Sequence, residues 1–211
     1  MAIDDLLDEH EQGERVRSWL RSNGGGIIGG ILLGLAAIGG WQWWQQHQRA
    51  EQAKAGEAYQ GVVDALGANG DPAKAAPKAA GLKGTAYGTL AALALAKAQV
   101  DAGKRDDAIA TLRSARSQDQ ALDAVVDQRL ARLLIDAGKP QDAIALLSQA
   151  TSSGALAIRG DAEFAAGKAD AARASYLKAL TTAEEGSPQR RLLELKLSQV
   201  GGAPEKPAAN T

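Results

Sequence analysis

The chain has 211 residues, of which 45% are hydrophobic, so it has room for one ordinary domain with an appendage but not for two large catalytic domains. Its 24 lysines and arginines nearly balance its 25 aspartates and glutamates. Because this balance leaves no basic excess to neutralise a phosphate backbone, we expect no nucleic-acid partner. There is no cysteine, which excludes disulfides, thiolate metal sites and cysteine nucleophiles. Only two histidines, His10 and His47, are available for imidazole chemistry.

Residues 1–23 form a short polar segment that we expect to lie in the cytoplasm. The segment begins with acidic residues. Three arginines, Arg15, Arg17 and Arg21, precede the apolar stretch that follows, and two basic residues, Arg49 and Lys54, come soon after that stretch. This charge bias is weak. The long domain beyond the stretch nevertheless favours a cytoplasmic amino end, since long domains are translocated largely regardless of their own charges.

Residues 24–44 are predicted to cross a membrane as a single helix. These 21 residues carry no formal charge, and at ~1.5 Å of rise each they extend over roughly 31 Å, close to the thickness of the hydrocarbon core of a bilayer. Trp41, Trp43 and Trp44 end the stretch, where indole rings favour the headgroup boundary. The alternatives are a buried core helix and a cleaved signal peptide, but the acidic start and the tryptophan cluster argue against a signal peptide.

Glycines recur along one side of the predicted span. Gly26, Gly30 and Gly34 are four residues apart, which leaves one face of a helix almost bare and lets another membrane helix approach closely. We therefore predict a helix-packing face. The alternative interpretation is that glycine only lowers the hydrophobicity of the anchor, and both stay open at this point.

Residues 45–200 are predicted to form an all-α domain on the non-cytoplasmic side of the membrane. β-branched and aromatic residues never alternate over a run there, whereas alanine, leucine and charged helix formers dominate. Asp71-Pro72 and Ser187-Pro188 each place a capping side chain before a proline, which predicts a helix start. Residues 201–211 are predicted to form a flexible tail.

A repeat runs through this domain. Asp-Ala-Gly-Lys occupies residues 101–104 and again 136–139, 35 residues later, and Ala-Ala-Gly-Lys occupies 165–168. Counted from each glycine, the positions seven before, five after and twelve after hold small residues, and the position nine after holds a large one. We expect a left-handed glycine to end the first helix of each hairpin, small residues to let its helices pack closely, and the large residue to fill the space between hairpins. The signature residues are Ala96, Gly103, Ala108, Leu112 and Ala115, then Ala131, Gly138, Ala143, Leu147 and Ala150, then Gly160, Gly167, Ala172, Tyr176 and Ala179.

This spacing resembles the tetratricopeptide repeat, over about residues 89–180. The resemblance implies an α-solenoid, a stack of antiparallel helix pairs with an extended concave wall that suits the binding of peptides or helices. The chain departs from the family at two positions where aromatic residues are preferred. The position four before each glycine holds Gln99, Leu134 and Glu163, and the position eleven before holds Ala92, Asp127 and Leu156.

As a whole, the chain resembles the YfgM family of ancillary SecYEG translocon subunits, over about residues 10–200. The resemblance lies in the order of short segments around one anchor, namely Trp41 to His47, Ala58 to Gln60, Thr85 to Gly88, Arg129 to Arg132 and Arg159 to Ala162. It implies a single-pass inner-membrane protein of a Gram-negative bacterium, whose periplasmic repeat domain works beside the SecYEG translocon. It further implies a PpiD-like membrane-anchored chaperone as a partner, secreted proteins as clients, and a role of the cytoplasmic end in a stress response.

No catalytic, cofactor-binding or metal site is expected. His10 and His47 flank the predicted span and cannot share a metal, and the acidic residues of the repeats alternate with basic ones as on solvated helix faces. We expect membrane lipid around the span, and Tyr59 and Tyr87 are candidate contacts for a soluble partner. Two other classes stay open, a scaffold for another envelope assembly such as a cell-wall or cytochrome-maturation complex, and an enzyme.

Overall fold

The computed structural model describes residues 4–67, 70–117 and 119–202, with side chains from residue 13 onward. Within these ranges it contains nine α-helices and no strand, which confirms the predicted all-α class. The chain divides into two units, residues 1–54 and residues 55–211. Only the first two residues of the predicted tail, 201 and 202, lie in the described part.

The first unit is helical wherever it is described. Helix α1 (Asp4–Ala65) includes the whole predicted span, although residues 24–44 contain eight glycines. In water each glycine lowers helix stability by up to about 1 kcal/mol relative to alanine, whereas in lipid an unpaired peptide group finds no water and a helix is favoured. By length and composition α1 can cross a membrane, with a mean hydropathy of 1.6 in its most apolar window.

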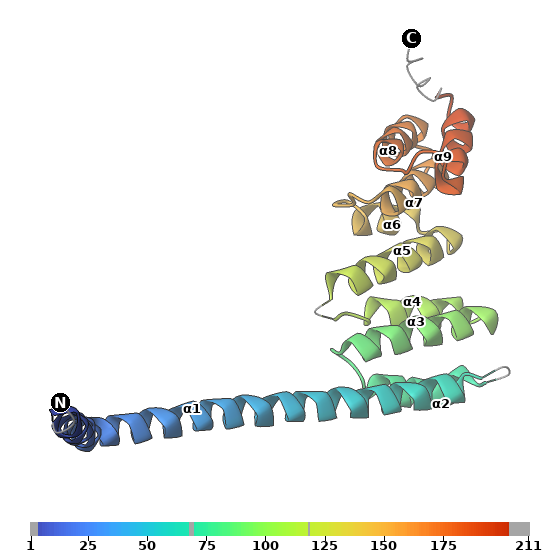
Figure 1. Cartoon of the computed structure of the whole chain (residues 1–211). Helices are drawn as coiled ribbons and strands as arrows, with labels where there is room; N and C mark the ends of the chain where they lie inside the picture. The colour runs from blue at the N-terminus through green and yellow to red at the C-terminus, as the bar shows by residue number, and fades with distance from the viewer. Residues whose placement is uncertain (1–3, 68–69, 118, 203–211) are drawn as a thin grey trace, which may run out of the picture. The chain divides into compact units, whose positions relative to one another are not determined.

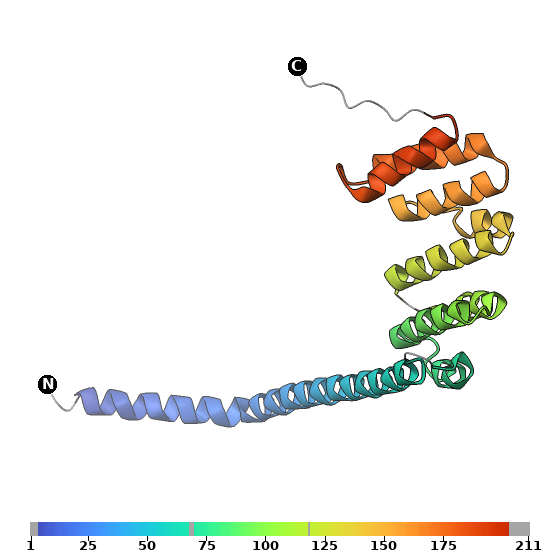
Figure 2. The same ribbon diagram turned by 90° about the vertical axis from the view of Figure 1, so that its right-hand side faces the viewer.

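The second unit is a stack of helix pairs (Figures 1 and 2). Helix α3 packs on α4, α5 on α6 and α7 on α8, while α9 covers α8 and α2 packs on α3. The pairs follow one another in chain order in both views, which is the arrangement of an α-solenoid. The bounds are α2 Pro72–Ala80, α3 Ala86–Asp101, α4 Arg105–Arg113, α5 Gln120–Asp136, α6 Pro140–Leu146, α7 Ser153–Ala165, α8 Ala169–Thr181 and α9 Pro188–Gln199.

Capping side chains fix five of the helix starts. In each case a side-chain oxygen accepts a hydrogen bond from a backbone N–H of the first turn, which would otherwise have no partner. The caps are Asp71, Thr85, Asp119, Ser152 and Ser187. The helix starts predicted at Asp71-Pro72 and Ser187-Pro188 are therefore confirmed, with proline in the first turn, where its missing N–H has no consequence.

The turns inside the three helix pairs share one backbone conformation. Gly103, Gly138 and Gly167 have φ angles of 73°, 70° and 75°, so the left-handed conformation expected of these glycines is present. In each turn the N–H of the following lysine donates to the carbonyl oxygen five residues earlier, at 2.7 to 2.8 Å. This bond gives a partner to a carbonyl that the helix end leaves free, which is why the turn recurs.

We predict that Gly103→Ala lowers the free energy of unfolding by about 1 kcal/mol, because a residue with a Cβ is disfavoured in the left-handed region. Nothing lies within 4 Å of a Cβ added at Gly103, so the backbone conformation alone causes the loss. Urea unfolding of the full chain in detergent, followed by circular dichroism, measures it. Gly81→Ala is the matched control, because Gly81 has a φ of −67° and alanine is tolerated there. Equal losses in the two variants would contradict this explanation.

Candidate functional site

The predicted repeat signature lies where helices meet inside the second unit. Apart from the three turn glycines, all of its residues are buried except Ala150, which is half-buried. Ala108, Ala143 and Ala172, five residues after each turn glycine, have no exposed surface at all. A larger side chain at these three positions would separate the helices, so the small residues set how closely the stack can pack.

The large residue of the third helix pair also packs inside its own pair. Leu112 and Leu147 belong to one apolar cluster shared by α3 to α7, whereas Tyr176 lies across Gly160 of its own partner helix α7. A Cβ atom at Gly160 would lie only 2.6 Å from Cδ1 of the Tyr176 ring. Tyr176 also belongs to an apolar cluster with Leu193 and Leu197 of α9, so it contacts the next helix of the stack as well. The tyrosine ring is larger than leucine, and it fits because its partner position holds glycine.

Paired polar side chains stand where the chain departs from the tetratricopeptide pattern. Thr111 Oγ1 donates to Gln99 Oε1 at 2.8 Å, and Ser175 Oγ donates to Glu163 Oε2 at 2.6 Å, each joining the two helices of a pair. Gln99 and Glu163 are both buried, and a buried polar group is stable only when it is hydrogen-bonded. In the middle pair, the equivalent positions hold Leu134 and Leu146, which pack in the apolar core. The sequence signal that could have revealed these contacts is that both members of each pair, twelve residues apart, change character together.

A polar cluster attaches α9 to the third helix pair. Tyr176 Oη donates to Asp161 Oδ1 at 2.8 Å, and Lys196 Nζ of α9 donates to both Asp161 oxygens at 2.7 Å. Burial, and next the hydrogen bond to Asp161, raise the pKa of the Tyr176 hydroxyl above its usual value near 10. Nearby, Arg173 donates to the carbonyl oxygen of Val200 at the end of α9. These bonds hold the last helix on the stack.

The two tyrosines expected to contact a partner pack against each other. The ring centroids of Tyr59 and Tyr87 are 5.9 Å apart, and both side chains are half-buried. The Tyr87 hydroxyl also lies beside Gly56, 3.4 Å from the position of a Cβ there. The pair therefore helps to pack the last turns of α1 against α3, and only its exposed edges are available to a partner.

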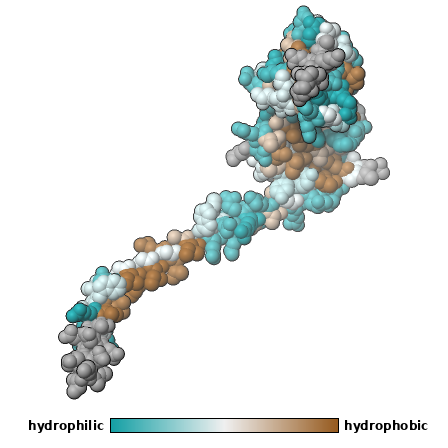
Figure 3. Space-filling model, turned by 45° about the horizontal axis from the view of Figure 1, so that its top comes forward, coloured by the Kyte–Doolittle hydropathy of each residue, from teal (hydrophilic) through white to brown (hydrophobic). Residues whose placement is uncertain are grey.

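In the first unit the predicted span is exposed. Its apolar side chains form the brown band on α1 in Figure 3, bordered by hydrophilic surface. Trp43 is 70% exposed and stacks on His47, with ring centroids 5.9 Å apart. Nothing lies within 4 Å of a Cβ added at Gly26, Gly30 or Gly34, so this face is open. The side chain of His10 lies outside the described residues.

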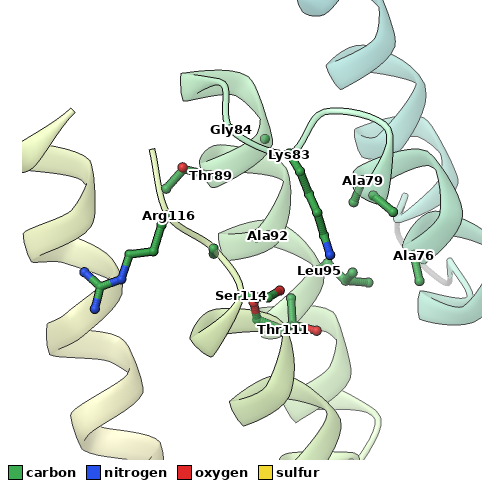
Figure 4. Close-up of a pocket in the computed structure, with 13 residues that line it drawn as sticks. Ala76, Ala79, Lys83, Gly84, Thr89, Ala92, Leu95, Thr111, Ser114 and Arg116 are labelled. Carbon is green, nitrogen blue, oxygen red and sulfur yellow. The ribbon is translucent and has the colours of Figure 1, made fainter. Parts of the chain in front are cut away.

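Two clefts open on the second unit on either side of α4. The first, of about 190 Å³, lies between α2, α3 and α4 and is lined mainly by alanine and glycine (Figure 4). The second, of about 320 Å³, lies between α4, α5 and α6, with Leu130, Leu134 and Leu146 among its lining residues and an ion pair of 3.1 Å between Arg113 and Asp142 beside them. Among the residues with described side chains, no group of three or more histidines, aspartates or glutamates is placed to hold a metal ion.

A family profile described as "Tetratricopeptide repeat-like domain" matches residues 17–202, which include both the apolar segment and the repeats. The chain belongs to this family. It is similar to the "Ancillary SecYEG translocon subunit" of Escherichia coli (strain K12), with 35% identity over 125 residues, or 58% of this chain and 61% of that protein. The protein of the same name from Haemophilus influenzae is 30% identical over 128 residues, or 58% of this chain and 62% of its own length. The match thus spans about three fifths of each relative, and it confirms the family resemblance expected from the sequence.

We predict that Gly160→Ala destabilises the chain by about 2 kcal/mol, because the added methyl group overlaps the Tyr176 ring in a packed core. Combining it with Tyr176→Leu recreates the alanine and leucine found at the same positions of the first two pairs. The double variant should therefore lose less stability than the sum of the two single losses, as urea unfolding would measure. Strictly additive losses would show that the two positions do not depend on each other.

We predict that Tyr176→Phe costs roughly 1.5 kcal/mol near neutral pH, since it removes a hydrogen bond to a carboxylate. Because the pKa of Tyr176 is raised in the folded chain, its protonated hydroxyl contributes its full stabilisation below pH ~10, where the hydroxyl of the unfolded chain is also protonated. As the pH rises above ~10, the unfolded chain loses this proton first, so the native protein loses stability that the phenylalanine variant does not. Urea midpoints measured at increasing pH should therefore converge, and a constant difference would contradict this role of the hydroxyl.

Proposed function

We propose that this protein is a single-pass accessory subunit of the SecYEG translocon in the bacterial inner membrane, and that it acts by binding proteins and not as an enzyme. Residues 1–23 lie in the cytoplasm, residues 24–44 cross the membrane, and residues 45–200 form the periplasmic repeat domain, followed by a flexible tail, 201–211. One observation carries this proposal: an exposed apolar helix and a helical repeat stack occur in one chain that is similar to two proteins named ancillary SecYEG translocon subunits.

Tryptophans at both ends of the apolar stretch support the membrane assignment. Trp19, which our sequence analysis did not use, is 57% exposed, and Trp41 is 63% exposed. They are 22 residues apart, or roughly 33 Å along a helix, so both indoles can lie at headgroup level on opposite sides of the bilayer. Arg17 and Arg21 lie at the end next to Trp19, where basic residues favour the cytoplasmic side.

We assign the proposed partners to two exposed surfaces of the chain. The open face of Gly26, Gly30 and Gly34 packs against a partner membrane helix, since a face without side chains allows close helix contact. The repeat domain works with a PpiD-like membrane-anchored chaperone and passes secreted clients to the periplasmic chaperones, with the exposed edges of Tyr59 and Tyr87 as contacts. The cytoplasmic end takes part in regulating a stress response.

Purification of the tagged chain from native membranes tests the proposal. We expect SecYEG components and a PpiD-like chaperone to co-purify with it, and Gly30→Leu to reduce their recovery several-fold by blocking close helix contact. Gly39→Leu is the matched control, because nine residues at 100° each place Gly39 on the opposite side of the helix from Gly30, in equally open surroundings.

Recovery of cell-wall or cytochrome-maturation components in place of the translocon would contradict the proposed function. Unchanged recovery with Gly30→Leu would contradict the packing face alone. Reporter fusions at the carboxyl terminus test the orientation separately, since they should be active only in the periplasm.

A further inference from the structure

We propose that the cleft between α2, α3 and α4 binds an extended segment of a client polypeptide in which an apolar side chain stands next to an acidic one. This inference rests on the proposed function, because it names the class of client that the repeat domain would hold. Three features of the cleft carry it, namely an apolar floor, a cation at its side without an ion-pair partner among the described side chains, and a second, partly apolar cleft next to it.

The floor of the cleft is apolar because its lining side chains are small. Ala79, Ala92 and Leu95 are all buried and line it, and Gly88 adds no side chain. Gly88 cannot carry a larger residue, since a Cβ there would overlap the backbone of Leu82 in the α2–α3 loop. The volume of about 190 Å³ is several times the ~30 Å³ of a water molecule, so an apolar side chain can enter and be removed from water.

The side of the cleft carries one free positive charge. Lys83 extends from the α2–α3 loop along the cleft toward Leu95 (Figure 4). In the part of the chain whose side chains are described, Lys83 has no ion-pair partner, and no residue that lines the cleft is acidic. Arg116 also lines the cleft, but its guanidinium is turned toward α5, where Nη2 lies 2.8 Å from Asp127 Oδ1. The Lys83 ammonium is therefore the group that a carboxylate of the ligand would meet.

The neighbouring cleft explains why the ligand is a polypeptide and not a small molecule. Arg116 lines both clefts, so they adjoin at this residue. Leu146 and the nearly fully buried Leu130 and Leu134 form the apolar part of the second cleft. In our proposal an extended chain places one apolar side chain in each cleft and its carboxylate at Lys83.

Fluorescence anisotropy of the purified full chain in detergent tests the charge contact. The probe is a fluorescein-labelled, end-capped peptide, Ser-Gly-Leu-Asp-Gly-Leu-Ser-Gly. We expect Lys83→Glu to weaken binding at least about five-fold, and the matched control Lys74→Glu, an exposed lysine of α2 outside the cleft, to leave it unchanged. Replacing the aspartate of the probe by asparagine should weaken binding to the native protein and remove the effect of Lys83→Glu, since the two groups act on each other.

Filling the cleft tests the apolar contact. Ala80 lines the cleft but is exposed, so Ala80→Leu occupies the space without disturbing the core, and we expect binding of the probe to fall about ten-fold. Ala73→Leu is the matched control, on an exposed part of the same helix outside the cleft. Circular dichroism of each variant shows that the fold is kept. Binding that responds to neither Lys83→Glu nor Ala80→Leu would overturn the proposal.

Co-purification of SecYEG with the same variants separates this inference from the proposed function. A native protein that recovers SecYEG but does not bind the probe overturns the client-binding cleft alone. A native protein that binds the probe through Lys83 but recovers no SecYEG overturns the translocon assignment, while the cleft still binds the peptide.

Discussion

The repeat domain depends on the close approach of its paired helices, which three fully buried alanines permit. Ala108, Ala143 and Ala172 occupy the same place in successive pairs and have no exposed surface. Alanine itself buries little apolar area, so most of the hydrophobic stabilisation must come from larger side chains held at the same crossings. The first two pairs bury a leucine at the large position, and the third buries a tyrosine that packs over a glycine. All three pairs keep the same connection, a turn with a left-handed glycine.

The same close approach limits what the neighbouring buried positions can hold. Two of the three pairs place a hydrogen-bonded polar pair between their helices, and the middle pair places two leucines there. A polar residue opposite a leucine would lose its water without gaining a partner, which costs about 1–3 kcal/mol. In the described part of the chain, no buried side-chain nitrogen or oxygen is without a hydrogen-bond partner. The repeats can therefore vary at these positions only when both members of a pair change together.

The sequence predicted the features that depend on local chemistry. The starts at Asp71-Pro72 and Ser187-Pro188 follow from capping, and the left-handed turns at the repeated glycines follow from backbone sterics. Features formed by residues far apart in the chain were not predictable in the same way. The hydrogen bond between Tyr176 and Asp161, and its extension to Lys196, depend on how α7, α8 and α9 cross. The cleft at Lys83 depends on three helices together, so neither composition nor spacing could reveal it.

A cleft with small lining residues, and with one cation that has no ion-pair partner among the described side chains, is suited to weak and broadly selective binding. One exposed ion pair contributes at most about 1 kcal/mol, and a floor of alanines distinguishes poorly between aliphatic side chains. For a freely diffusing protein such binding would be too weak to matter. In the proposed role, the membrane anchor restricts the domain to the surface where clients emerge, and tethering by a short linker gives effective concentrations on the order of millimolar. Weak contacts are then sufficient to delay a passing chain, and fast release allows the client to move on to another chaperone.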